Sequence, residues 1–173
     1  MNLDHLWAGW RSEYVSSILD DRVAGPDGAE GGSLFERILT SGRPDEEVFV
    51  VRRGERCSVL LNVYPYTNGH LMVLPNRPLA DLEELDDDEE RELWSLVRQG
   101  VVALKRAFHC EGVNIGLNLG SAAGAGVPGH LHVHVLPRWG GDTNFMTTVA
   151  NTRVLPVSLE SSWESLRESW PEE

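Results

Sequence analysis

Apolar and polar residues follow helical spacing in some segments of the chain and strand-like alternation in others. Apolar positions three and four residues apart predict amphipathic helices over residues 1–20 and 158–170. The motif SLFE at residues 33–36 predicts the capped start of a short helix. An acidic run at residues 83–90 is expected to open a long helix that continues through Leu104, because carboxylates stabilise the positive end of a helix.

Runs of aliphatic and β-branched residues, separated by turn residues, predict a sheet. The predicted strands are residues 48–51, 58–63, 71–75, 113–119 and 130–136. Residues 53–55 are the expected turn of a hairpin between the first two strands. Strands, one long crossing helix and more strands predict an α+β domain with a mainly antiparallel sheet of about five strands. A length of 173 residues allows a single domain over residues 1–173, with its core at about residues 46–145.

Composition places the chain among ordinary globular proteins and excludes several classes of function. With 15 basic and 27 acidic residues the net charge is −12, which disfavours binding to nucleic acids and to anionic membranes. Between Glu111 and Arg138 only histidines can carry a charge, but the glycine, asparagine and serine residues of this stretch argue against a membrane span. Cys57 and Cys110 stand apart and outside any C-x-x-C motif, and no export signal is visible near Met1. We therefore expect a reducing, cytoplasmic location.

The acidic run also offers hard oxygen ligands, which would suit a magnesium site at residues 86–88. A solvated helix start explains the same carboxylates through their interaction with the helix dipole. We therefore expect no magnesium site in this run.

A row of histidines is the strongest chemical signal, because His130, His132 and His134 alternate with aliphatic residues. Successive side chains of a strand point to opposite faces, so the three imidazoles are expected on one face and the aliphatic residues in the core. Such a row suits a metal site, a nucleophile with positioning partners, or a polar strand face. Acidic partners are absent until Asp142, and no H-E-x-x-H or H-x-H-x-D motif occurs, so we expect no metal and no other cofactor.

A glycine-rich segment at residues 120–126 lies shortly before the histidines, and such a turn brings backbone N–H groups close to an anion. No G-x-x-x-x-G-K-[S/T] motif is present and Lys105 is the only lysine, which excludes a Walker-type ATPase. Neutral imidazole, with an ordinary pKa of about 6.5, can attack phosphorus at neutral pH without a strong base. These neighbours favour metal-free phosphoryl chemistry.

Residues 130–136, HLHVHVL, resemble the signature of the histidine-triad family of nucleotide hydrolases and transferases, in which three histidines alternate with apolar residues. Asn62 and the Gly-His pair at residues 69–70 are similar to the family's first substrate-binding strand pair, and Asn118 to its second polar substrate contact. The resemblance spans nearly the whole chain. It is greatest to the bacterial diadenosine tetraphosphate phosphorylase branch, at residues 4–7, 64–66 and 137–145.

The resemblance implies a histidine-triad fold and a role for each histidine. His132 attacks the α-phosphorus of a nucleotide and forms a nucleotidyl-histidine intermediate. His134 contacts the phosphoryl oxygens, and His70 with His130 forms a supporting hydrogen-bond network. The implied substrate-binding groups are Asn62 for the ribose, Asn118 for phosphate or ribose, the backbone of Gly124, Ala125 and Gly126 for nonbridging oxygens, and Arg138 for added charge.

Phosphate and water are the two acceptors expected to resolve this intermediate. With inorganic phosphate as co-substrate, the expected activity is that of a diadenosine tetraphosphate phosphorylase, which releases ADP and ATP. With water it is hydrolysis of dinucleoside polyphosphates or nucleoside phosphoramidates. A binding module that holds a nucleotide with weak turnover is the alternative from another class. The resemblance also implies a homodimer.

One segment and one single residue depart from the family's pattern. Residues 126–129, Gly-Val-Pro-Gly, replace the glutamine and the serine or threonine whose hydroxyl assists the leaving group. No side-chain donor remains in that segment, and Ser121 is the candidate substitute. Asn68 replaces the usual proline before Gly69 and His70, which is expected to affect the turn more than the chemistry.

Overall fold

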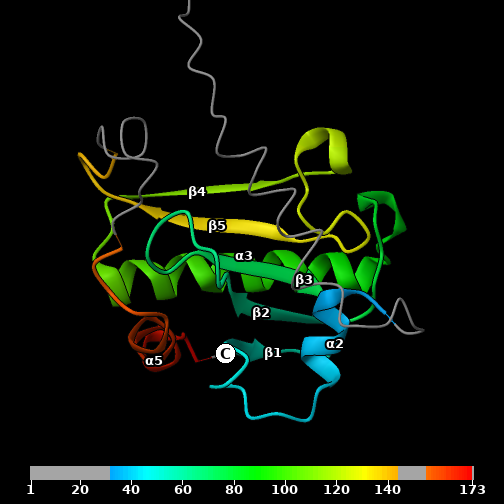
Figure 1. Cartoon of the computed structure of the whole chain (residues 1–173), viewed down its shortest axis with the longest axis horizontal. Helices are drawn as coiled ribbons and strands as arrows, with labels where there is room; N and C mark the ends of the chain where they lie inside the picture. The colour runs from blue at the N-terminus through cyan, green and yellow to red at the C-terminus, as the bar shows by residue number, and fades with distance from the viewer. Residues whose placement is uncertain (1–31, 144–154, 173) are drawn as a thin grey trace, which may run out of the picture. The chain divides into compact units, whose positions relative to one another are not determined.

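The computed structural model describes residues 32–143 and 155–172, so the predicted helix over residues 1–20 lies outside the described residues. Residues 32–142 together with 155–172 belong to one compact unit. In chain order its elements are α2 (Leu34–Thr40), β1 (Val50–Arg53), β2 (Cys57–Leu61), β3 (Leu71–Pro75), η1 (Leu82–Glu84), α3 (Asp87–Phe108), β4 (Gly112–Leu117), η2 (Ser121–Ala123), β5 (Val133–Arg138) and α5 (Leu159–Ser169), as Figure 1 shows. None of the described helices is both long and apolar enough to cross a membrane.

The strands form one sheet in the order β1-β2-β3-β5-β4, and every neighbouring pair is antiparallel. This arrangement confirms the predicted five-stranded antiparallel sheet and the predicted hairpin between β1 and β2. Helix α3 connects β3 to β4, and β5 then enters between these two strands. The predicted α+β class with a long crossing helix is therefore confirmed.

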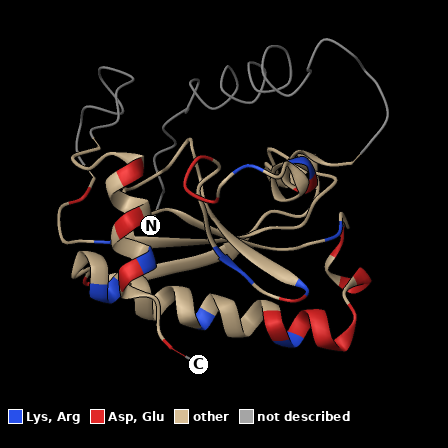
Figure 2. Ribbon diagram, turned by 90° about the horizontal axis from the view of Figure 1, so that it is seen from below, with Lys and Arg blue, Asp and Glu red and all other residues tan. Residues whose placement is uncertain are grey.

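The acidic run forms the start of α3, as its charge pattern predicts. Asp86 is the N-cap, and its side chain accepts hydrogen bonds from the backbone N–H groups of Asp88 and Glu89. Glu89 returns a hydrogen bond to the backbone of Asp86 and completes a capping box. Figure 2 shows the acidic residues, coloured red on the ribbon, gathered at this end of the long helix, where the helix dipole favours negative charge.

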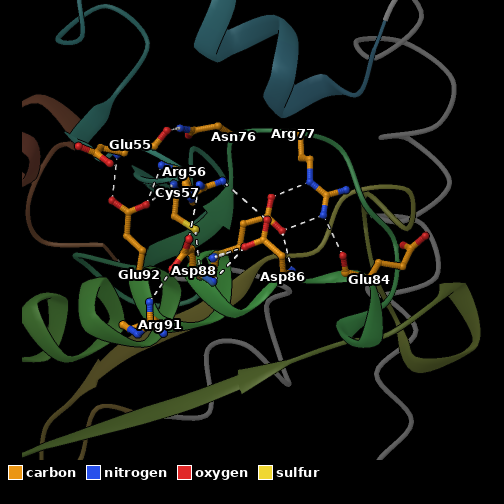
Figure 3. A network of polar contacts seen from close by, with 11 residues as sticks. Glu55, Arg56, Cys57, Asn76, Arg77, Glu84, Asp86, Asp88, Arg91 and Glu92 are labelled. Carbon is orange, nitrogen blue, oxygen red and sulfur yellow. Dashed lines mark hydrogen bonds and ion pairs between the residues drawn. The ribbon is translucent and has the colours of Figure 1, made fainter.

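Two carboxylates of α3 also tie the helix to the sheet (Figure 3). Glu89 is buried and forms a two-pronged ion pair with Arg77, at 2.6 and 2.7 Å. Glu92 accepts hydrogen bonds from three successive backbone N–H groups, those of Glu55 and Arg56 in the turn between β1 and β2 and that of Cys57 at the start of β2. The acidic run therefore has a structural role. Within the described residues, no group of three or more histidine, cysteine or acidic side chains is arranged to hold a metal ion.

The sheet has an apolar core on each face. On one face, Val59 of β2 belongs to a cluster with Leu93 of α3 and Leu166 of α5. On the other face, Leu60 of β2 belongs to a cluster with Phe35 of α2. Neighbouring residues of one strand alternate between the two clusters because successive side chains of a strand point in opposite directions.

This alternation places the last triad histidine on the α2 face. Met72 of β3 is paired with His134 of β5, and side chains of directly paired residues lie on the same face of a sheet. Met72 belongs to the same cluster as Phe35. Val133 and Val135, on either side of His134, are fully buried against α3, as the sequence pattern predicts.

The prediction that a strand starts at residue 130 is wrong, because β5 begins at Val133. The backbone N–H of His130 donates to the Val127 carbonyl in a turn, and that of Leu131 donates to the Leu79 carbonyl outside the sheet. Only His134 of the three histidines is therefore on a strand. His130 and His132 lie on the segment that leads into it.

The other predicted elements that fall within residues 32–143 and 155–172 differ from the structure only at their ends. Strand β1 starts at Val50, two residues later than predicted, because Phe49 has a positive φ of 56° that interrupts the extended backbone. Helix α2 follows the N-cap Ser33, as the sequence predicts. Helix α5 covers Leu159–Ser169, one residue shorter at each end than the predicted helix, and Ser158 is its N-cap.

Candidate active site

Four histidines converge on the α2 face of the sheet, and all are at least 92% buried: His70 and His130 are 0% exposed, His132 5% and His134 8%. His132 and His134 are neighbours, with ring centroids 4.8 Å apart and the rings nearly perpendicular. His70, which immediately precedes strand β3, contacts His134, with ring centroids 5.0 Å apart. The histidines singled out in the sequence therefore form one cluster.

His132 is held in a single tautomer by the backbone. Its Nδ1 lies 2.8 Å from the carbonyl oxygen of His130, and a carbonyl can only accept a hydrogen bond. The ring proton is therefore on Nδ1, and the neutral ring has its lone pair on Nε2. Burial lowers the pKa of His132, and the hydrogen bond to the His130 carbonyl partly offsets this effect. A neutral imidazole with its lone pair on Nε2 is a nucleophile at neutral pH.

His134 has the opposite tautomer, set by a relay through His70. The backbone N–H of Tyr66, at 3.1 Å, and the side-chain amide of Asn62, at 3.4 Å, both donate to Nδ1 of His70. Nε2 of His70 therefore carries the ring proton and donates a hydrogen bond to Nδ1 of His134 at 2.9 Å. His134 is left with its proton on Nε2. A hydrogen-bond donor thus lies beside the ring of His132, the predicted nucleophile.

His130 is part of the scaffold of the site. Its Nε2 donates to the carbonyl oxygen of Pro75 at 2.8 Å, and its Nδ1 contacts the hydroxyl of Ser33. Burial lowers the pKa of His130, which keeps this fully buried ring neutral. Both ring nitrogens of His130 are engaged by the protein, whereas its backbone carbonyl holds His132.

The two asparagines occupy the ends of strands next to the histidines. Asn62 follows β2, where its side-chain oxygen accepts from the backbone N–H of Tyr64 at 2.9 Å. Asn118 follows β4, whose last residue, Leu117, is paired with Val133. Asn118 and His132 each lie one residue beyond this last pair of the two strands. Both positions are compatible with the substrate contacts that the sequence predicts, which stay predictions.

The glycine-rich loop forms internal hydrogen bonds. The N–H of Gly124 donates to the Ser121 carbonyl at 3.0 Å, and that of Ala125 donates to the Gly120 carbonyl at 3.3 Å. Gly124 has a φ of +91°, a conformation that glycine adopts without strain. Phosphate binding by the backbone of Gly124, Ala125 and Gly126 stays a prediction. For the backbone N–H groups of Gly124 and Ala125, phosphate binding requires the loop to release these internal hydrogen bonds.

Arg138 is held by protein groups at the end of β5. Its guanidinium donates to both carboxylate oxygens of Asp142, at 2.6 and 2.8 Å, and to Asn114 at 2.8 Å. This pairing lowers the pKa of Asp142 to about 2. The carboxylate offsets much of the positive charge of Arg138, whose predicted contribution to phosphate binding stays untested.

The comparison with protein families agrees with this geometry. Residues 43–141 match the family model of the HIT domain. The chain belongs to the HIT domain family. This confirms the resemblance to the histidine-triad proteins that the row of histidines indicates.

One similar protein covers nearly the whole chain, and another covers about half of it. It is 38% identical over 168 residues to a protein named AP-4-A phosphorylase from Mycobacterium tuberculosis, covering 97% of this chain and 85% of that protein. It is 34% identical over 89 residues to a protein named bis(5'-nucleosyl)-tetraphosphatase (asymmetrical) from Schizosaccharomyces pombe, covering 51% of this chain and 48% of that protein.

Solved structures confirm the HIT fold. The crystal structure of a zinc-bound histidine triad family protein from Mycobacterium smegmatis superposes with a TM-score of 0.65 and 27% identity, covering 79% of this chain and 91% of that one. A HIT-like protein from Bartonella henselae superposes with a TM-score of 0.64 and 20% identity, covering 81% of this chain and 98% of that one.

Three residues that contact the HIT histidines were not assigned to the site from the sequence. Ser33 contacts His130, and the ring of Phe35 packs edge-on against two of the histidine rings. Tyr66 lies over His70, with ring centroids 4.8 Å apart. The capping motif identifies Ser33 as a helix start, but no signal in the sequence connects it to a histidine 97 residues away.

Proposed function

We propose that this protein transfers a nucleotidyl group from a dinucleoside polyphosphate through a histidine-bound intermediate, with phosphorolysis of diadenosine tetraphosphate as its principal reaction. The observation that carries this proposal is the pair of opposite tautomers at adjacent rings, a lone pair on Nε2 of His132 and a proton on Nε2 of His134. The similarity of nearly the whole chain to an AP-4-A phosphorylase supports the choice of substrate.

In the first step Nε2 of His132 attacks the α-phosphorus of diadenosine tetraphosphate. The N–P bond forms as the bridging P–O bond to the β-phosphate breaks, so AMP is bound to the histidine and ATP leaves. The modified ring becomes cationic. Because its Nδ1–H still donates to the carbonyl of His130, the protein stabilises this charge without moving a proton.

In the second step an oxygen of inorganic phosphate attacks the same phosphorus. The N–P bond breaks, ADP forms and His132 returns to its neutral state. In both steps Nε2–H of His134 donates to a nonbridging oxygen, where negative charge develops in the transition state. The hydrogen bond from His70 holds His134 in the orientation that this contact requires.

The segment before the histidines bears on the choice of leaving group. Residues 126–129 supply no side-chain hydroxyl to assist protonation of the leaving group. An amine leaving from a phosphoramidate needs a proton, whereas ATP leaves as a weakly basic polyphosphate anion. The segment therefore supports a dinucleoside polyphosphate rather than a phosphoramidate as the substrate.

Isotope-labelled phosphate tests the proposal and separates the two acceptors. Incubation with diadenosine tetraphosphate and ³³P-labelled phosphate is expected to yield ATP and labelled ADP in equal amounts, measured by nucleotide chromatography. A hydrolase would instead release unlabelled AMP and ATP, or two molecules of unlabelled ADP. It would form these products at the same rate with and without inorganic phosphate. Binding of the nucleotide with no products in either condition would identify a binding module.

The proposal extends to assembly and location. As the resemblance implies, we expect the active protein to be a homodimer, a state that sedimentation analysis measures.

Cys57 and Cys110 are buried free thiols, and burial raises the pKa of Cys57 to about 12. Unpaired thiols suit a reducing compartment, which supports the proposed cytoplasmic location.

A further inference from the structure

Ser33 links the start of helix α2 to the first histidine of the triad. As the N-cap of α2, its Oγ accepts a hydrogen bond from the backbone N–H of Glu36 at 3.2 Å. The same oxygen contacts Nδ1 of His130, 97 residues further along the chain. Ser33 lies outside residues 43–141, which match the HIT domain. This link is therefore made by a segment that precedes the family's domain.

The direction of the hydrogen bond between Ser33 and His130 follows from its surroundings. Nε2 of His130 faces the Pro75 carbonyl at 2.8 Å, so this nitrogen carries the ring proton. The ring is fully buried and neutral, which leaves the lone pair on Nδ1. The Ser33 hydroxyl must then donate to Nδ1. The backbone N–H of Glu36 donates to the same oxygen and orients the hydroxyl for this bond.

The bond reaches the nucleophile through one intermediate residue. The backbone carbonyl of His130 accepts from Nδ1 of His132 at 2.8 Å, and this bond sets the tautomer of His132. Phe35, two residues after Ser33, packs against the same pair of rings. Its centroid is 5.4 Å from that of His130 and 5.2 Å from that of His132. The first turn of α2 thus makes a polar contact with one histidine and apolar contacts with both.

We propose that Ser33 is a positioning residue for nucleotidyl transfer: its hydroxyl holds His130 in one tautomer and orientation, and the backbone of His130 in turn aims Nε2 of His132. This inference rests on the proposed function. Ser33 acts through His130, so its loss is expected to slow the chemical step more than it weakens nucleotide binding.

Three substitutions separate the hydroxyl donor from the helix cap. Ser33→Ala removes both. Ser33→Asp keeps a strong N-cap but offers only acceptor oxygens, and Ser33→Thr keeps both the cap and the hydroxyl. Ser158→Ala is the matched control, because Ser158 caps α5 in the same way, accepting from the Ser161 N–H at 3.2 Å, without contacting a histidine.

The measurements are steady-state kinetics and ¹⁵N NMR of the histidine rings. For Ser33→Ala and Ser33→Asp we expect kcat to fall roughly tenfold with little change in KM, whereas Ser33→Thr and Ser158→Ala keep the original kcat. The ¹⁵N shifts are expected to show His130 protonated only on Nε2 in the original protein. In Ser33→Asp both ring nitrogens become protonated, because the carboxylate needs a donor.

An unchanged kcat in a folded Ser33→Asp protein would overturn the inference, and so would an unchanged ¹⁵N spectrum of His130. Because Ser33→Asp keeps the helix cap, its kcat and its ¹⁵N spectrum can be measured even where Ser33→Ala is too unstable to study. Equal losses of kcat in Ser33→Ala and Ser158→Ala, with no loss in Ser33→Asp, would assign the effect to helix stability. The NMR readout needs no turnover, so failure of the proposed reaction is distinguished from failure of this inference.

Discussion

Nε2 of His70 lies 2.9 Å from Nδ1 of His134, although 64 residues separate the two histidines in the chain. His70 immediately precedes β3 and His134 is on β5, and the pairing of these strands brings the rings together. Because the backbone N–H of Tyr66 donates to Nδ1 of His70, the relay runs in one direction only. This relationship makes His134 a hydrogen-bond donor beside His132, the proposed nucleophile.

Replacing the nucleophile is expected to abolish turnover. His132→Asn removes the Nε2 lone pair that attacks phosphorus, so kcat should fall by a factor of at least about 10⁴ while nucleotide affinity changes little. Steady-state assays and isothermal titration with AMP measure the two quantities. His109→Asn is the matched control, because His109 is exposed at the end of α3 and has a left-handed conformation that asparagine tolerates. A His132→Asn protein with its original kcat would refute the mechanism.

Removing the relay is expected to slow the reaction without weakening binding. His70→Phe fills the same space but donates no hydrogen bond to His134, so kcat should fall between about tenfold and a hundredfold. His70→Gln retains an N–H donor and should recover part of the loss. A His70→Phe protein with unchanged kcat, checked for folding by circular dichroism, would show that His134 does not depend on this bond.

The pH dependence of activity follows from the lowered pKa of His132. Burial favours its neutral, nucleophilic form, so the acidic limb of kcat/KM should lie below the ordinary histidine pKa of 6.5. A pH profile of kcat/KM measures this limb directly. An acidic limb at or above pH 6.5 would contradict the assignment of His132 as the buried neutral nucleophile.

The same burial affects stability at low pH. Above pH 6.5 His130 and His132 are neutral in both the folded and the unfolded chain, so their contribution is complete. Below pH 6.5 the unfolded chain takes up protons that the folded protein resists, and stability falls until pH reaches the lowered folded pKa values. Urea titrations should show this fall, and it should be smaller in His132→Asn, which has one titrating group fewer. An equal fall in both proteins would contradict this account.

A chelator is expected to leave turnover unchanged. Nδ1 of His132, Nδ1 of His134 and both ring nitrogens of His130 are engaged by protein groups, so the imidazole lone pairs do not converge on one point. Turnover after dialysis against EDTA measures this directly. Loss of activity with the chelator and recovery with zinc would overturn the prediction.

The carboxylate of Glu92 is expected to stabilise the fold rather than the reaction. Its three hydrogen bonds to the backbone of residues 55–57 are lost in Glu92→Ala, which should lower the free energy of unfolding by about 2 kcal/mol. Urea denaturation measures this change, and kcat should stay constant. Glu90→Ala, at an exposed position of the same helix, is the control and should have a smaller effect. Equal effects of the two substitutions would contradict a specific role for Glu92.

Much of the fold could be predicted because it depends on local patterns. The apolar runs identify all five strands, and the acidic run with Asp86 as its cap identifies the start of α3. The start of β5 could not be found in this way. His130 to His132 alternate with aliphatic residues like a strand, but their backbone groups pair with Val127 and Leu79 instead of a neighbouring strand.

The sequence by itself determined the histidine row, the order of the elements and the family, because each of these is set by residue type and spacing along the chain. Only the tertiary structure decided which ring nitrogen carries each proton. The partners that settle this are the Pro75 carbonyl, Tyr66 N–H and Ser33 hydroxyl, which are remote from residues 130–134 in the chain, together with the carbonyl of His130. A tautomer depends on the direction of hydrogen bonds between distant segments, and no linear pattern of residues encodes it.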